Sequence, residues 1–227
     1  MIWAVIPAAG RGSRFGSEIP KQYLEAAGRP LIAHALDALL SHPRVAGAVV
    51  ALAADDPHWP GWTEWNGKPV LRCTGGGERA DSVLAALRAV PDEAGDDVLV
   101  LVHDAARPNL RGEDIDRLLA AALAHADGAI LGAPVRDTLK RADTHTRIVA
   151  TEPRTALWRA FTPQAFRRGA LADALEHARA DGVLVTDEAM AMERAGAQPM
   201  LVEGREDNLK VTTRADLALA DYLLRQR

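Results

Sequence analysis

A glycine-rich segment near the N-terminus gathers positive charge. Arg11, Arg14 and Lys21 fall within eleven residues of one another, and glycines recur between Gly10 and Gly16. Glycine lets backbone amides approach an anion closely, because no Cβ atom stands in the way. Each cation alone would be ordinary for a solvated surface, but three together repel one another unless they share an anionic ligand. We therefore predict a site for the phosphates of a nucleotide.

Two familiar phosphate-binding motifs are absent from this segment. The dinucleotide fingerprint needs a small residue where the chain has Phe15, and the ending Gly-Lys-Ser or Gly-Lys-Thr does not occur. The chain also has no acidic residue that ends a second strand about 20 positions further on. An NAD-dependent oxidoreductase is therefore an alternative that the glycines suggest and Phe15 weakens.

Two later loops also carry residues that could do chemistry. Asp104 ends an apolar run, where a carboxylate can meet ribose, a substrate hydroxyl or a metal, or can cap the next turn. Ser82 follows Gly76 and Gly77 at the start of a segment with helical spacing. Its hydroxyl would either receive a phosphate or a base, or make an ordinary hydrogen bond at the helix start.

The elements that must position these loops alternate along the chain. Apolar runs bounded by turn residues are typical of strands, and they cover Ile2–Pro7, Val45–Ala53, Val70–Cys73, Val98–His103, Ala129–Pro134 and Met200–Val202. Helical spacing occurs over Leu31–Leu40, Ala80–Val90, Ile115–Ala126 and Leu171–Ala180. This alternation predicts a three-layer α/β fold with a mainly parallel sheet, whose ligand lies beyond the carboxyl ends of the strands.

One polar segment interrupts the alternation. From Val135 to Thr151, charged residues stand on both sides of a possible turn at Ala142–His145, with β-branched residues flanking it. This pattern predicts a projecting β-hairpin arm at about 135–155, and a solvated loop is the alternative. No linker separates a second domain, so we expect residues 1–227 to form a single domain.

Composition excludes several classes of protein. The chain has 48% hydrophobic residues, a formal net charge of −4 and one cysteine, Cys73. The negative charge argues against a nucleic-acid partner, and the single cysteine favours a reducing, cytoplasmic location. The apolar N-terminal run stops at Pro7 and is too short to span a membrane, so we expect no membrane association.

Motifs along nearly the whole chain resemble those of the methylerythritol phosphate cytidylyltransferases. The matching segments are Ala8–Arg14, Pro20–Tyr23, Gly76–Ser82, Val102–Pro108, Pro134–Thr138, Thr162–Gln164, Thr186–Ala189 and Asn208–Thr212. One departure is Gly77, where that family usually has Asp. A backbone contact to the base would survive this change, whereas a side-chain contact would not.

The resemblance implies a Rossmann-like nucleotidyltransferase fold and roles for particular residues. Arg14 and Lys21 would stabilise the transition state, and Arg154 and Lys210 would align the acceptor phosphate. The CTP site would comprise Ala8, Ala9, Gly10, Gly12, Gly76, Gly77, Ser82 and Asp104. The acceptor, a small sugar-alcohol phosphate, would meet Asp104, Arg107, Thr138, Arg154, Thr162, Thr186 and Lys210. Thr186 precedes a helix start, so an N-cap is its ordinary alternative.

The resemblance also implies assembly and a metal. Members of the family form homodimers in which each hairpin reaches over the partner's active site, and Mg²⁺ accompanies the triphosphate through protein ligands that the sequence leaves open. The reaction implied is CMP transfer to 2-C-methyl-D-erythritol 4-phosphate in isoprenoid precursor synthesis. Ribitol 5-phosphate as acceptor, or a nucleotide sensor without catalysis, remain alternatives.

Overall fold

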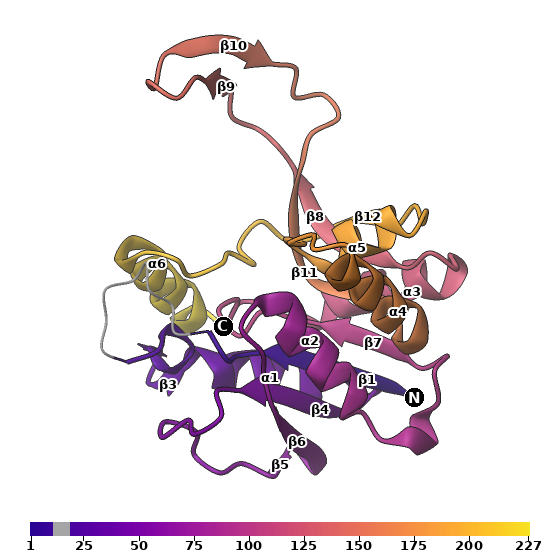
Figure 1. Cartoon of the computed structure of the whole chain (residues 1–227). Coiled ribbons are helices and arrows are strands. Elements are labelled where there is room, and N and C mark those ends of the chain that lie inside the picture. The colour runs from indigo at the N-terminus through magenta and orange to yellow at the C-terminus, as the bar shows by residue number, and fades with distance from the viewer. Residues whose placement is uncertain (11–18) are drawn as a thin grey trace.

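A computed structural model of the chain describes residues 1–10 and 19–227. Its centre is an eight-stranded sheet in the order β12-β8-β11-β7-β1-β4-β6-β5 (Figure 1). The strands are β1 Ile2–Pro7, β4 Val45–Leu52, β5 Glu64–Trp65, β6 Lys68–Thr74, β7 Leu99–Val102, β8 Ala129–Pro134, β11 Trp158–Arg167 and β12 Met200–Glu203. The pairs from β7 through β1 and β4 to β6 are parallel, as is the pair of β12 with β8. The predicted mainly parallel sheet is therefore confirmed.

Helices cover both faces of this sheet, because the central strands are apolar on both sides. Alternate residues of a strand point to opposite faces, so Ala4 and Ile6 pack in one buried cluster while Trp3 and Val5 pack in another. The first cluster includes α1 (Leu31–Leu40) and α3 (Gly112–Ala124). The second includes α2 (Arg79–Arg88), α4 (Arg168–Ala180) and α5 (Glu188–Arg194). These two clusters are the cores of a three-layer fold.

Smaller elements complete the described chain. The single-turn 3-10 helices are η2 (Lys21–Tyr23) and η3 (Asp92–Ala94), and β2 (Glu25–Ala26) pairs with β3 (Arg29–Pro30). The last helix, α6 (Arg214–Arg225), packs against β2 and contributes to a third, small apolar cluster. Within residues 1–10 and 19–227, no helix is long and apolar enough to cross a membrane.

Strand β11 was not predicted, and Pro163 explains the omission. A proline inside a strand argues against a central position, because it cannot donate to the ladder. Here β11 runs antiparallel between β7 and β8, and its pairing with β8 shifts register between Ala160 and Gln164. This irregularity accommodates the proline in the middle of the sheet.

The predicted arm is present. β9 (Leu139–Ala142) and β10 (Ile148–Glu152) pair only with each other among the strands described, and they project away from the sheet (Figure 1). The arm leaves from β8 and returns through β11, which pair with each other at Pro134 and Trp158. Both roots of the arm are therefore strands of the central sheet.

Candidate functional site

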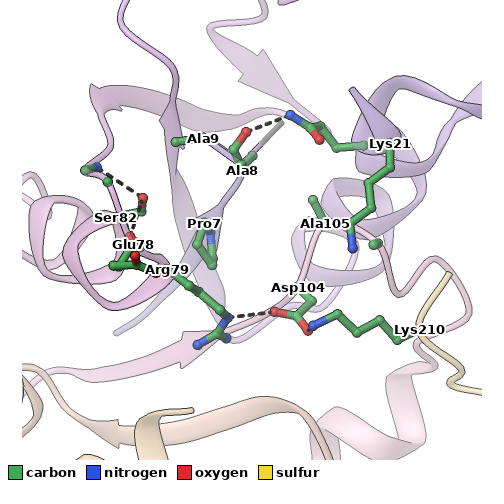
Figure 2. A pocket seen from close by; sticks show the side chains of 15 residues that line it. Pro7, Ala8, Ala9, Lys21, Glu78, Arg79, Ser82, Asp104, Ala105 and Lys210 are labelled. Carbon is green, nitrogen blue, oxygen red and sulfur yellow. Dashed lines mark hydrogen bonds and ion pairs between the residues drawn. The ribbon is translucent and has the colours of Figure 1, made fainter. Parts of the chain in front are cut away.

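A cavity of about 410 Å³ opens beyond the carboxyl ends of β1, β6 and β7. Figure 2 shows side chains from several elements meeting around it. Its wall contains nine of the predicted site residues, namely Ala8, Ala9, Gly10, Lys21, Gly76, Gly77, Ser82, Asp104 and Lys210. Gly12 and Arg14, with Arg11 and Phe15, lie outside the described residues. The loops that follow three parallel strands therefore share one crevice, as the sequence predicted.

Backbone hydrogen bonds hold the first loop against the sheet. The amide of Ala8 donates to the carbonyl of Ala51 at 2.8 Å, which extends the pairing of β1 with β4. The buried Gln22 side chain donates from Nε2 to the carbonyl of Ala8 at 2.7 Å. Because Gln22 adjoins Lys21 in η2, this bond ties the turn that carries Lys21 to the loop after β1. Beyond its place in the family motif, Gln22 carries no signal in the sequence that indicates this role.

Ser82 joins the glycine loop to the start of α2. Its hydroxyl donates to the carbonyl of Glu78 and accepts from the amide of Gly76, both at 3.2 Å. The helix-start hydrogen bond that we offered as the ordinary role is therefore present, although the cap residue itself is Glu78. Ser82 also lines the cavity, so the same hydroxyl remains within reach of a ligand.

Asp104 is the centre of an ionic cluster. Lys210 Nζ lies 2.8 Å from Asp104 Oδ2, Arg79 Nε lies 3.1 Å from Oδ1, and Arg107 Nε lies 3.7 Å from Oδ2. Burial raises the pKa of Asp104, but the positive charges of Arg79, Lys210 and Arg107 outweigh it and hold the pKa far below the usual range. The carboxylate therefore stays ionised.

A buried chain of hydrogen bonds fixes the backbone under Asp104. Burial lowers the pKa of His103 to about 4, so its ring is neutral. Its Nε2 lies 3.0 Å from the carbonyl of Arg107. A carbonyl oxygen only accepts hydrogen bonds, so Nε2 carries the proton of the neutral ring. Nδ1 is therefore the acceptor for the hydroxyl of Thr162, which lies 3.0 Å away. Thr162 in turn accepts from the amide of Asp104 at 3.0 Å.

This arrangement changes how Thr162 is interpreted. The sequence placed Thr162 among the acceptor contacts, but its side chain is buried, its hydroxyl is already used in both directions, and it does not line the cavity. Its geometry suits a positioning role beneath Asp104.

Arg107 has a similar place behind the cavity wall. It is buried, its Nη1 donates to the carbonyl of Asn208 at 2.8 Å, and its guanidinium lies 5.0 Å from the centre of the Phe161 ring. The amide of Val211 donates to the carbonyl of Ala106 at 2.8 Å. These contacts fix the segment that carries Lys210, whereas the sequence placed Arg107 in contact with the acceptor.

The structure brings in Arg79, to which the sequence assigned no role. Arg79 lines the cavity at the first position of α2 and bridges Asp104 to Glu188, the first residue of α5. The distances to Glu188 are 2.5 Å from Nη1 to Oε1 and 3.1 Å from Nη2 to Oε2. The side chain of Glu188 is buried, whereas that of Arg79 is 27% exposed at the cavity.

Three predicted acceptor residues lie apart from the cavity. Thr138, just before β9, and Arg154, just after β10, are exposed, and neither lines the cavity of its own chain. Thr186 is exposed and precedes α5. The N-cap role offered for Thr186 is wrong by one residue, because the cap is Asp187, whose side chain accepts from the amide of Met190. The Thr186 hydroxyl instead points to the sulfur of Met190 at 3.6 Å, since the carboxylate of Asp187 is the stronger acceptor for the helix start.

The acidic residues of the cavity bear on metal binding. Within the described chain, no group of three or more His, Cys, Asp or Glu side chains could hold a metal ion. The cavity wall contributes Glu78 and Asp104, and Asp104 is already paired with cations. Such a donor set fits Mg²⁺, which takes one or two protein carboxylates at most when substrate phosphates supply other ligands.

Comparisons with known proteins point to one family along nearly the full length of this chain. A model of the 2-C-methyl-D-erythritol 4-phosphate cytidylyltransferase family matches residues 2–226. A relative of that name from Stenotrophomonas maltophilia (strain R551-3) is 62% identical over 226 residues, covering 100% of this chain and 97% of the relative. One from Xanthomonas campestris pv. campestris (strain 8004) is 61% identical, covering 100% of this chain and 85% of the relative.

Solved structures give the same result. The 2-C-methyl-D-erythritol 4-phosphate cytidylyltransferase from Francisella tularensis aligns with a TM-score of 0.84 and 33% identity, covering 98% of this chain and 99% of that one. The corresponding protein from Thermus thermophilus aligns with a TM-score of 0.79 and 33% identity, covering 98% of both chains.

Proposed function

Since this chain belongs to the 2-C-methyl-D-erythritol 4-phosphate cytidylyltransferase family, and so transfers CMP from CTP to methylerythritol phosphate, we propose that both substrates meet in the cavity of Figure 2. The observation that carries this proposal is the convergence of Lys21, Lys210 and the glycine loops on one crevice beyond the parallel strands. The family assignment favours this acceptor over ribitol 5-phosphate, and it replaces the oxidoreductase and sensor alternatives.

The nucleotide half of the site is built largely from backbone. We assign the loops Ala8–Gly10 and Gly76–Gly77, with the hydroxyl of Ser82, to CTP. Cytosine carries an amino donor where uracil carries an oxygen, so one well-placed carbonyl acceptor can exclude UTP. The two loops also pack closely on each other, because a Cβ at Gly75 would lie 2.5 Å from Ala9 Cβ and 2.7 Å from Ser82 Oγ.

The chemistry needs charge stabilisation rather than proton transfer. A phosphate-monoester oxygen of the acceptor attacks the α-phosphorus of CTP, a new P–O bond forms, and the bond to the β-phosphate breaks to release pyrophosphate. The second pKa of a phosphate monoester is about 6, so the attacking group is already ionised at neutral pH. Lys21, together with Arg14 outside the described residues, would stabilise the charge that develops on the α-phosphate. Lys210, held by Asp104 at 2.8 Å, would align the acceptor phosphate.

A divalent metal completes the charge balance. We propose that Mg²⁺ binds with the triphosphate, where it would neutralise the phosphate oxygens and assist departure of pyrophosphate. Asp104 and Glu78 are the carboxylates of the cavity wall that could contact its hydration shell. Asp104 can equally meet the ribose or an acceptor hydroxyl.

The acceptor half requires a second chain. We propose a homodimer in which Thr138 and Arg154 of each arm contact the acceptor in the partner's cavity, with Thr186 contributing from its own chain. The arm supports this proposal because it exposes apolar side chains, including Ile148 at 68% and Val149 at 63%, that a partner would cover. We further propose one catalytic domain spanning residues 1–227, and a cytoplasmic location in keeping with the unpaired Cys73.

Pyrophosphate release tests the assignment directly. The purified chain should release pyrophosphate from CTP with methylerythritol phosphate, and far less with UTP or with ribitol 5-phosphate. Replacing Lys210 by Ala should raise the KM for the acceptor and lower kcat while CTP binding persists. Wild-type kinetics in Lys210→Ala would refute the placement of the acceptor in this cavity.

A further inference from the structure

We propose that Arg79 is a positioning residue that aims Asp104, and through it Lys210, by anchoring both to the buried start of α5. The inference rests on the proposed function, since it takes Asp104 and Lys210 as parts of the reaction site. Arg79 itself is placed neither in the attack nor in binding of the departing pyrophosphate.

The geometry of the guanidinium makes Arg79 a rigid bridge. Nη1 and Nη2 form a fork on the two carboxylate oxygens of Glu188, while Nε donates to Asp104 Oδ1 at 3.1 Å. These donors lie in one plane with fixed angles between them. The position of Glu188 therefore determines where Nε points, and so how the Asp104 carboxylate is turned.

The two oxygens of Asp104 have different partners. Oδ2 faces Lys210 and Arg107, whereas Oδ1 accepts from Arg79. Without Arg79 the carboxylate could rotate about its bond to Cβ and carry the ammonium group of Lys210 with it. Figure 2 shows Arg79, Asp104 and Lys210 in this order along one side of the cavity.

The far end of the bridge is firmly held. The carboxylate of Asp187 caps α5 and also accepts from Gln164 Nε2 at 2.9 Å, while Gln164 Oε1 accepts from the amide of Ala189 at 2.9 Å. Gln164 belongs to β11 in the central sheet and is buried. Glu188, between these two anchored residues, is thus fixed relative to the sheet.

A purely structural ion pair is the competing explanation, and paired substitutions separate the two. Removing one partner of a buried pair is strongly destabilising, but replacing both by apolar residues of similar size often restores stability. Arg79→Met should therefore destabilise the protein, and Arg79→Met combined with Glu188→Leu should restore the free energy of unfolding. The matched control is Arg88→Ala, which breaks an exposed pair with Glu176 at the other end of α2.

Steady-state kinetics of the double variant, whose stability is restored, distinguish a positioning role of Arg79 from a purely structural one. We expect kcat/KM for methylerythritol phosphate to fall about tenfold to a hundredfold, because a small misplacement of an aligning group is costly. Binding of CTP, measured by calorimetry, should change little, and Arg88→Ala should match the wild type. Wild-type kinetics in the stable double variant would reduce Arg79 to a structural role. A loss confined to CTP affinity would make it a direct nucleotide contact, and either result overturns the proposal.

Asp104→Asn distinguishes failure of this inference from failure of the proposed function. If Asp104→Asn is impaired while the double variant is not, the inference about Arg79 fails and the site stands. If Asp104→Asn itself keeps wild-type kcat/KM, the assignment of Asp104 to the reaction site is wrong.

Discussion

Among single residues, Lys21 is expected to act mainly on the rate of the chemical step. A fixed charge about 4 Å from a developing negative charge contributes on the order of 4 kcal/mol at an effective dielectric near 20, before solvent reduces it. Lys21→Ala should therefore lower kcat by about 10² or more while the KM for CTP changes less. Single-turnover and steady-state rates would measure this. The control is Lys68→Ala, because Lys68 lies at the start of β6 and does not line the cavity. Near-normal turnover of Lys21→Ala would refute the assignment.

Gly75, directly after β6, should not tolerate a side chain, whereas a glycine remote from the cavity should. A Cβ at Gly75 would lie 2.5 Å from Ala9 Cβ and 2.7 Å from Ser82 Oγ, whereas at Gly112, the first residue of α3, nothing lies within 4 Å. Gly75→Ala should therefore push the two nucleotide loops apart and raise the KM for CTP, while Gly112→Ala should leave it nearly unchanged. Titration of each variant with CTP tests this, and equal effects at both positions would contradict the proposed packing.

At this scale the sequence predicted residues whose position follows from strand ends. Asp104 and the loops near Ala8 and Gly76 come directly after apolar runs, and parallel strands bring such ends together. Arg79 and Gln22 escaped a functional assignment because their partners, Glu188 and the carbonyl of Ala8, are brought to them by tertiary folding. A single sequence does not specify which distant carboxylate an arginine will meet.

At the scale of elements, the arm allows a test by mixing two inactive proteins. Lys21→Ala damages the cavity of its own chain, and Arg154→Ala damages the arm. If arms are exchanged, a mixed dimer has one site with both defects and one site with neither. We therefore expect activity to return when the two variants are unfolded together, refolded and assayed for pyrophosphate release.

Each variant refolded alone provides the control for that experiment. If each arm served its own chain, every site in the mixture would keep one defect and no activity would return. Light scattering of the wild type would report the assembly independently, and a monomer with full activity would contradict arm exchange.

The elements that the sequence predicted are those with regular periodicity. The strand Ile2–Pro7 and the helix Leu31–Leu40 coincide with the structure, because apolar residues on both sides of a buried strand and along one stripe of a helix specify them. β11 was missed since Pro163 and its polar neighbours break the strand pattern. The start of α5 was predicted with its N-cap one residue early, at Thr186 in place of Asp187, and α6 was not predicted.

At the scale of the whole molecule, the buried His103 should make stability depend on pH. Its pKa is lowered from 6.5 to about 4, so the folded state binds fewer protons than the unfolded state between these values. The stabilisation is present above about pH 6.5 and is lost as the pH falls toward 4, by about 3 kcal/mol in total. Urea unfolding at pH 7.5 and pH 4.5 should show a smaller loss for His103→Gln than for the wild type.

An exposed histidine provides the comparison for that measurement. His145 lies at the tip of the arm and is exposed, so His145→Gln should retain the full pH dependence of the wild type. If His103→Gln lost as much stability on acidification as His145→Gln, the claim that His103 is buried in its neutral form would be refuted.

The way the arm is rooted in the sheet also makes its tip a useful site for probes. Because β8 and β11 are held on both sides within the sheet, changes in the exposed turn between β9 and β10 should not propagate to the reacting groups of the same chain. A fluorophore attached there, in a background that lacks Cys73, could report subunit association by energy transfer while catalysis proceeds. The same turn is where insertions of extra residues would be absorbed most readily.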